Sequence, residues 1–168
     1  MTPFGTVRIR VAALVTQHEE FALIRRVRGG VEQYTVPGGN VDLEAAEPLD
    51  EALRRELDEE LGLRLKPETE LRLLAVQDQM VSRPGPTAPP RKLHLVFHVP
   101  VDGEQRAAMA GVEHDELGEG QIVWRSRAEA VGLHLFPAVG PLLAGWDERS
   151  PAGSLLLPGL TDANFRWV

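Results

Sequence analysis

Three glutamates, Glu56, Glu59 and Glu60, lie close together in the first half of the chain. Successive residues of a helix are about 100° apart, so a helix through this segment would place the three carboxylates within one arc. Such like charges repel one another by about a few tenths of a kcal/mol per pair, which a helix selected only for stability would avoid. Grouped carboxylate oxygens are what a hard cation such as Mg²⁺ prefers. The glutamates therefore suggest a cation site, although an acidic helix face taken alone is more often only solvated.

The residues around the glutamates predict that they lie on a helix. Pro48 suits a first helical position, because the N–H that proline lacks has no helical partner there. Gly62 suits the position that follows the last helical turn. A buried stripe is predicted by leucines that recur every four residues: Leu49, Leu53, Leu57 and Leu61. Glu56 and Glu60 flank this stripe, so the helix would carry them at the edge of its packed face.

The same segment carries a longer motif. Gly39 is followed by Glu47, and then by Arg55-Glu56-Leu57, Glu59-Glu60 and Gly62-Leu63. This order closely resembles the Nudix box, and from Glu47 to Leu63 every required residue is present at the required spacing. The chain departs from the family in one place, because seven residues separate Gly39 from Glu47, which is two more than usual. Glu44 therefore competes with Glu47 for the position of the first glutamate.

The resemblance implies a fold and an activity. The Nudix fold is an α+β architecture, an α/β/α sandwich with a mixed central β-sheet. Nudix hydrolases cleave the diphosphate linkage in a nucleoside diphosphate joined to another group, and a nucleoside triphosphate or a nucleotide sugar would both fit. The alternative is a catalytically silent Nudix-like module that binds a nucleotide or regulates another protein. Such modules commonly lose glutamates of the box, and this chain keeps them.

The resemblance also assigns roles within the box. It implies Mg²⁺ or Mn²⁺ as the cofactor, with Glu56, Glu59, Glu60 and the carbonyl of Gly39 as ligands. Glu56 and Glu59 would take part in catalysis, and Glu59 is either a ligand or the base that activates water. Arg55 would orient the carboxylates by pairing with Glu47 or with Glu44.

Substrate-binding residues are expected before the helix. Arg25 and Arg26 end a predicted strand, where Nudix-like chains often carry basic residues that face the substrate phosphates. Tyr34 resembles the aromatic residue that commonly precedes Pro-Gly-Gly in the family. Gly38, like Gly39, would let the backbone approach its neighbours closely.

One more glutamate could join the site from the acidic, glycine-rich segment 102–120. This segment resembles the mobile loop that supplies a metal ligand or a base in many Nudix enzymes. Its candidates are Glu113, Glu116 and Glu119, and the sequence does not choose among them.

Composition limits the other function classes. The 168 residues carry a formal charge of −7, which argues against a general binder of nucleic acid or anionic membranes. The absence of cysteine excludes disulfides and thiolate metal sites and fits a reducing compartment. No apolar run approaches the length of a membrane span. We therefore expect a small nucleotide-type substrate, no nucleic-acid or membrane partner, and a cytoplasmic location.

The chain is predicted to form one Nudix domain, 1–146, followed by a tail, 147–168, that packs on the domain or on a partner subunit. A homodimer is thus left open. Strands are predicted at 6–15, 21–27, 34–36, 64–76, 92–101 and 121–124. A capped helical turn is predicted at 126–130, a helix at 135–146, and a proline-rich loop within 77–91 that is either a plain connection or a rim of the active site. His94 and His98 are interpreted as polar residues of a sheet face, in preference to metal ligands.

Overall fold

The computed structural model describes residues 4–82, 86, 88–115, 118–147 and 155–166. Within these ranges the strands are β1 Val7–Gln17, β2 Glu20–Arg28, β3 Val31–Thr35, β4 Gly38–Asn40, β5 Arg72–Met80, β6 Arg91–Pro100, β7 Val112–Asp115, β8 Gly118–Ser126, β9 Leu135–Phe136 and β10 Leu160–Thr161. The helices are α1 Leu49–Leu61, α2 Gly103–Ala108, α3 Arg127–Ala130 and α4 Gly140–Ala144. None of these helices is both long enough and apolar enough to cross a membrane.

The strands form one mixed sheet with the order β10-β5-β6-β1-β2-β3-β9. β1 runs parallel to β6 from Val7 to Thr16, whereas β1 and β2 pair only beside their connecting turn, at Thr16 and Gln17. Beyond this turn the two strands separate, and the free edge of β1 is taken by the short strand β4. β2 pairs instead with β3 and β8. The sheet therefore opens into two halves, and β4 lies at the opening.

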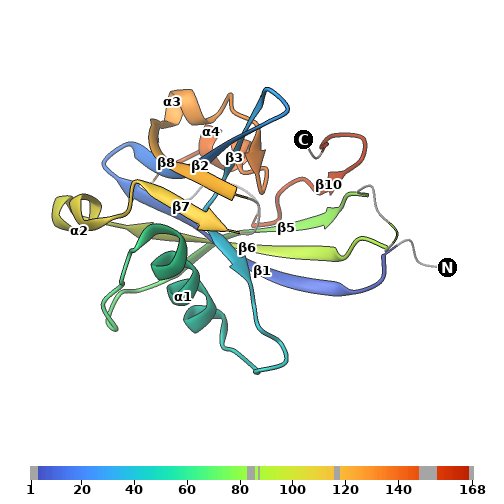
Figure 1. Ribbon diagram of the computed structural model, residues 1–168, viewed down its shortest axis with the longest axis horizontal. Coiled ribbons are helices and arrows are strands. Elements are labelled where there is room, and N and C mark those ends of the chain that lie inside the picture. The colour runs from blue at the N-terminus through green and yellow to red at the C-terminus, as the bar shows by residue number, and fades with distance from the viewer. Residues whose placement is uncertain (1–3, 83–85, 87, 116–117, 148–154, 167–168) are drawn as a thin grey trace.

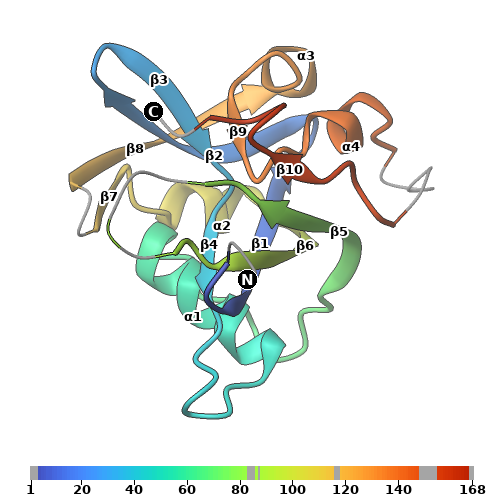
Figure 2. The same cartoon turned by 90° about the vertical axis from the view of Figure 1, so that its right-hand side faces the viewer.

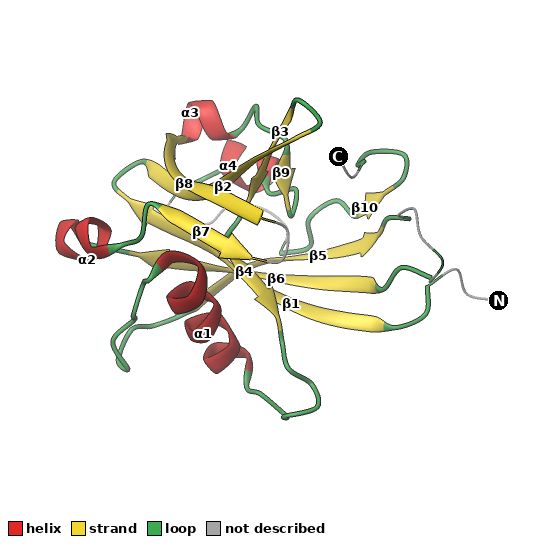
Figure 3. Ribbon diagram, in the orientation of Figure 1, coloured by secondary structure: helices red, strands yellow, loops and turns green. Residues whose placement is uncertain are grey.

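Helices cover both faces of the sheet, as Figures 1 and 3 show. The helix α1 packs through Leu53, Leu57 and Leu61 on one face, in a core that includes Val11 and Val15 of β1. On the other face, α3 and α4 pack on a second core that includes the alternate residues of the same strand. This arrangement confirms the predicted α/β/α sandwich.

The strand β1 is more deeply buried than its sequence predicts. Alternation between Thr6 and Val15 predicts a half-buried strand, yet every residue from Val11 to Val15 is buried. The prediction is wrong in this respect because the second layer covers the other face. The same layer buries His94 and His98 of β6. Their Nε2 atoms lie 2.7 Å from Gln79 Oε1 and 2.8 Å from Thr16 Oγ1, respectively, so both rings are bonded within the protein.

Three segments differ from their predictions. The strand predicted at 64–76 begins only at Arg72. The predicted mobile loop 102–120 contains the helix α2, which a capping box at Asp102 begins, and the hairpin of β7 and β8. The helix predicted at 135–146 is confined to α4, because β9 first pairs with β3 and Pro137 follows it directly. Pro141 lies in the first turn of α4, where proline is tolerated. In contrast, the capped turn predicted at 126–130 is confirmed as α3, with Ser126 and Glu129 forming a capping box.

The described part of the tail, residues 155–166, lies on the domain, as Figure 2 shows on the side of β5. Val76 N–H donates to Leu155 O at 2.7 Å, and Leu157 N–H donates to Val76 O at 2.8 Å. Farther along, β10 continues this parallel pairing beside β5, and Phe165 is buried against Phe136. Part of the proline-rich loop, residues 83–85 and 87, falls outside the described residues, so its expected role as a rim stays a prediction.

The leucine stripe of α1 is confirmed in three of its four positions. Leu53, Leu57 and Leu61 are fully buried, whereas Leu49 is 40% exposed because it begins the helix beyond the edge of the sheet. Pro48 is the N-cap residue, one position earlier than predicted, and Gly62 ends the helix in the left-handed conformation at φ 63°.

We predict that Leu57→Ala lowers the free energy of unfolding by about 3 kcal/mol, because it leaves a cavity between α1 and the sheet. Leu49→Ala, at the exposed end of the same stripe, should cost less than about 1 kcal/mol. Urea denaturation, monitored by circular dichroism, measures the free energy of unfolding of both variants. Equal losses in the two variants would contradict the packing described for α1.

Candidate active site

The glycine turn before α1 fits closely against the helix. A Cβ atom at Gly39 would lie 2.2 Å from Glu56 Cδ, so a side chain there would displace the carboxylate. Gly38 has a φ of 139°, and a Cβ at this position would lie 2.1 Å from Val11 O. Gly38 must therefore be glycine for β4 to pair with β1, whereas glycine at position 39 leaves the Glu56 carboxylate in its place. The turn thus brings the backbone at Gly39 to the edge of the glutamate face.

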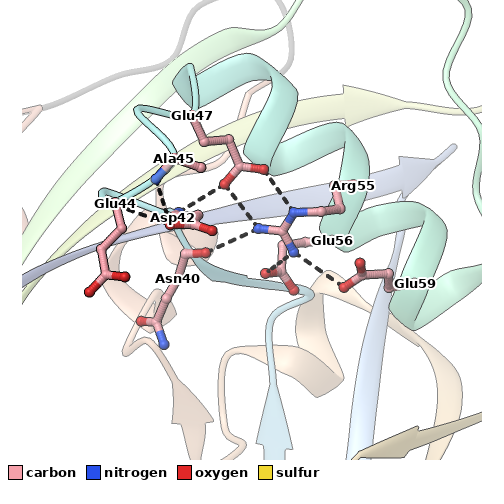
Figure 4. A network of polar contacts seen from close by, with 8 residues as sticks. All are labelled: Asn40, Asp42, Glu44, Ala45, Glu47, Arg55, Glu56 and Glu59. Carbon is pink, nitrogen blue, oxygen red and sulfur yellow. Dashed lines mark hydrogen bonds and ion pairs between the residues drawn. The ribbon is translucent and has the colours of Figure 1, made fainter.

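Arg55 bonds four residues of the site through its guanidinium group (Figure 4). Its Nε and Nη2 donate to the two oxygens of Glu47, at 2.7 and 3.1 Å. Its Nη1 donates to Glu56 Oε1 at 2.7 Å and to Glu59 Oε2 at 3.2 Å, and Nη2 also donates to Asn40 O at 3.2 Å. The predicted pairing of Arg55 with Glu47 is present, and it is bidentate.

The longer loop does not displace Glu47 from the site. The Asp42 carboxylate accepts bonds from Glu44 N–H at 3.1 Å and Ala45 N–H at 3.0 Å, and Ala46 takes a left-handed conformation with a φ of 53°. The Asp42 N–H also donates to the Glu47 carboxylate, at 2.9 Å. Figure 4 shows the Glu44 carboxylate pointing away from Arg55. Of the two candidates, the structure places Glu47 in the position of the first glutamate.

Glu60 lies on the inner side of the cluster. Its Oε2 accepts a hydrogen bond from Gly38 N–H at 2.6 Å. Burial raises the pKa of Glu60 to about 7, and the charges of Glu56 and Glu113 add to this effect. The positive charge of Arg10 and the bond from Gly38 act in the opposite direction but do not cancel it.

Glu113 lines the site from the opposite half of the sheet. Its side chain is 4% exposed and forms an ion pair with Arg26, which is also buried. A polar cleft of about 500 Å³ is lined by Gly38, Gly39, Asn40, Glu56, Glu59, Glu60, Glu113 and His114. Of the three acidic candidates in 102–120, Glu113 therefore lines the cleft, Glu119 is exposed on β8, and Glu116 lies outside the described residues.

Comparison with known proteins decides the family. The NUDIX domain model matches residues 6–142. The chain belongs to the Nudix family. The recognition of the box is thereby confirmed, and so is the prediction of a hydrolase that cleaves phosphoric anhydride bonds.

Solved Nudix and MutT structures share the fold. The E. coli ORF135 protein is 25% identical with a TM-score of 0.56, and the match covers 83% of this chain and 87% of that one. A MutT protein from Bacillus halodurans is 19% identical with a TM-score of 0.61, over 82% and 80% of the two chains. The NUDIX domain of Shewanella oneidensis NrtR, solved with ADP ribose, is 18% identical with a TM-score of 0.54, over 79% and 80%. No curated protein matches the chain.

The candidate ligand atoms of this Nudix site are oxygens, the type of atom that a hard divalent cation prefers. Four carboxylates and the backbone of Gly39 line one cleft, and oxygen ligands are those that Mg²⁺ and Mn²⁺ prefer. In the described part of the chain, however, no three acidic or histidine side chains converge closely enough to hold an ion. Arg55 bonds both Glu56 and Glu59, so their carboxylates are directed partly toward the guanidinium.

The predicted substrate-binding residues divide into two groups. Gly38 lines the cleft of the Nudix site, and Arg26 contacts it through Glu113. Arg25 lies on the other side of β2, where it bonds Glu32 and Gln121. Tyr34 is buried in the core beneath α3 and α4, and its hydroxyl donates to Glu32 at 2.8 Å. The structure therefore does not bring Arg25 and Tyr34 to the cleft.

Sequence reasoning missed Arg10. Alternation with Val7, Ile9 and Val11 predicts a polar outward-facing residue, yet Arg10 is 6% exposed and donates from Nη2 to Val36 O at 3.2 Å and to Gly38 O. An arginine at an alternate position of a strand is ordinary for a solvated face. Only the second layer of the sandwich shows that this face is buried.

The bidentate pairing of Glu47 has a measurable consequence. Bonds from Arg55, and then from the Asp42 N–H, lower the pKa of Glu47 from its ordinary 4.5 to about 2. A pKa that is lower in the folded state stabilises the protein above the ordinary value, and this stabilisation is lost as the pH falls toward 2. We predict a carboxyl titration of Glu47 near pH 2 by ¹³C NMR.

In Arg55→Met the Glu47 midpoint should rise toward 4.5. Arg64→Met is the control, because Arg64 lies beyond the helix end, is 85% exposed and pairs with Asp58 of α1, away from Glu47. An unchanged midpoint in Arg55→Met would show that the bidentate pair does not hold Glu47 in solution.

Proposed function

We propose that the protein is a metal-dependent pyrophosphohydrolase that acts on a small nucleoside diphosphate joined to another group. One observation carries the proposal: Glu56, Glu59, Glu60 and Glu113 line a single open cleft beside the glycine turn. Each carboxylate comes with a bonding partner that orients it, as expected of a retained active site. A cluster that served only as a solvated helix face would have no need of Glu113 from β7.

The charge of the cleft supports the requirement for a cation. Among the described residues that line it, four are glutamates and none is lysine or arginine. A diphosphate is itself an anion, so these carboxylates alone would repel it. We therefore propose that Mg²⁺ or Mn²⁺ is held by Glu56, Glu60 and the Gly39 carbonyl, with Glu59 or Glu113 beside them. When bound, the cation would neutralise the phosphate oxygens and acidify a water molecule.

The remaining chemistry is assigned to the side chains themselves. Glu56 and Glu60 are held by the glycine turn, one against Gly39 and the other by Gly38 N–H, which suits fixed ligands. Glu59 is 60% exposed and accepts a single bond from Arg55 at 3.2 Å, which suits a group that must move. We assign Glu59 to accept the proton of the attacking water, whose oxygen bonds to phosphorus as the bridging P–O bond breaks and the phosphate leaves.

Glu56→Gln and Glu60→Gln should each lower kcat by about 10²- to 10³-fold, because an amide replaces a charged oxygen ligand at unchanged volume. Glu51→Gln, on an exposed position of the first turn of α1, should keep full activity. Phosphate release measured with Mg²⁺ and with Mn²⁺ gives these values. Full activity of Glu60→Gln on the best substrate would refute the assignment.

The substrate needs a separate experiment. Phosphate release should be screened over nucleoside triphosphates, oxidised nucleoside triphosphates, nucleotide sugars, dinucleoside polyphosphates and ADP-ribose. ADP-ribose is included because the NrtR neighbour was solved with it. We expect metal-dependent turnover of at least one class. Tight nucleotide binding without turnover under any metal would favour the second candidate, a silent nucleotide-binding or regulatory module.

Other parts of the prediction remain proposals. These are the division of the chain into a domain, 1–146, and a tail, 147–168, a cytoplasmic location, and the absence of a nucleic-acid partner. A homodimer is likewise left open, although the described tail residues already pack on their own domain. Size-exclusion chromatography with light scattering would decide the oligomeric state.

A further inference from the structure

Arg10 occupies a position where a charge is costly. It lies on β1 between His94 of β6 and Asn40 of β4, on the sheet face that α3, α4 and the C-terminal segment cover. Ala12 and Leu14 occupy the next two positions on this face, and both are fully buried apolar residues. Burying a guanidinium costs several kcal/mol unless hydrogen bonds compensate, so packing alone does not account for Arg10.

The guanidinium is used to hold the glycine turn. Nη2 donates to the carbonyls on either side of Pro37, Val36 O at 3.2 Å and Gly38 O. In the described structure Arg10 Nη1 is buried without a hydrogen-bond partner, so the position of the guanidinium is not the one that would satisfy all of its N–H donors. The guanidinium is instead placed to donate to the two carbonyls of the turn.

Gly38 connects Arg10 to the active site. The carbonyl of Gly38 accepts from Arg10 on the covered face of the sheet, while its N–H donates to Glu60 Oε2 at 2.6 Å on the side of α1. The Gly38 carbonyl also belongs to the peptide unit that leads into Gly39. The N–H that orients Glu60 belongs to the Pro37–Gly38 peptide unit, whose carbonyl accepts from Ala13 N–H at 2.9 Å. Arg10 bonds the peptide units on either side of this one, and thereby braces the N–H and the chain that enters Gly39.

The surroundings of Arg10 act on its charge in opposite directions. Burial lowers the pKa of its guanidinium, while the nearby charges of Glu60 and Glu56 raise it, so the cleft carboxylates act as distant counter-ions. Burial also lowers the pKa of His94 well below 6.5, and Arg10 adds to this effect, so the adjacent ring stays neutral. The Phe136 ring covers the guanidinium, with 5.4 Å between Arg10 Cζ and the ring centroid.

We propose that Arg10 is a positioning residue of the active site: it fixes the glycine turn, which bonds the Glu60 carboxylate of α1 and presents the Gly39 carbonyl to the divalent cation. The inference rests on the proposed function, because it assumes that this cation is bound there. Arg10 touches neither substrate nor cation. It acts through the backbone of Gly38, from the opposite side of the sheet.

The test is a titration of the metal-free full-length protein with Mn²⁺. The signal of free Mn²⁺ in electron paramagnetic resonance gives the dissociation constant. Arg10→Lys keeps the charge but can bond only one carbonyl well, and Arg10→Met removes both charge and donors. Positioning predicts weaker binding in both, severalfold for lysine and about tenfold or more for methionine, as for other groups that orient metal ligands. Arg8→Met, an exposed neighbour on the same strand face, is the matched control and should bind as the unmodified protein does.

Two other results would each point to a different role for Arg10. If Arg10 acted only through its charge, its removal would relieve repulsion, so Arg10→Met would bind Mn²⁺ more tightly and Arg10→Lys would not change. If Arg10 were only structural, both variants would melt at a lower temperature yet bind Mn²⁺ normally while folded. Either result overturns the inference and leaves the proposed function standing.

Failure of the unmodified protein to bind Mn²⁺ would overturn the proposed function together with the role of Arg10. Glu56→Gln serves as the reference for a lost ligand in the same assay. Should Arg10→Met fail to fold, Arg10→Lys still decides. Positioning requires the Mn²⁺ affinity of Arg10→Lys to fall, whereas a purely electrostatic or a purely structural role of Arg10 requires it to stay unchanged.

Discussion

The contact between α1 and the glycine turn is the constraint on which the site depends. The Glu56 carboxylate occupies the space that a side chain at position 39 would need, and Gly38 N–H reaches Glu60 at 2.6 Å. Both sides of this contact are held independently. Leu57 and its neighbours fix the helix on the sheet, and β4 is fixed by pairing with β1. The glutamates are therefore placed by two packed elements, which is more precise than placement on a loop.

Once packed in this way, the carboxylates repel one another, and three arginines of the fold offset part of this repulsion. Arg55 approaches from the solvent side, Arg26 from the opposite half of the sheet through Glu113, and Arg10 from behind the glycine turn. The pKa of Glu60 shows which effect dominates, because a value of about 7 means that burial exceeds the help of Arg10 and Gly38. A site so poor in free positive charge is suited to receive a cation, and only then an anionic substrate.

The parts of this arrangement that the sequence predicts are those set by local rules. Helical spacing predicts α1 and its glutamate face, and a serine followed three residues later by glutamate predicts α3. The parts that it misses depend on distant partners. Arg10 looks like a surface residue until a second layer covers it, and the acidic segment 102–120 looks like a loop although pairing with β8 makes part of it a strand. The helix predicted at 135–146 fails for the same reason, because β9 pairs with β3 first.

The longer loop shows what the spacing in the motif measures. Counting residues from Gly39 leaves Glu44 and Glu47 as rivals, whereas the structure selects Glu47 because both of its oxygens meet the guanidinium of Arg55. The added length is taken up between them by the turn at Asp42 and the left-handed Ala46, and the ends of the loop stay where Arg55 can bond both. Because loop closure costs little for each added residue, the pair tolerates a longer connection. The requirement is thus a distance between Arg55 and a glutamate, and the number of intervening residues is secondary to it.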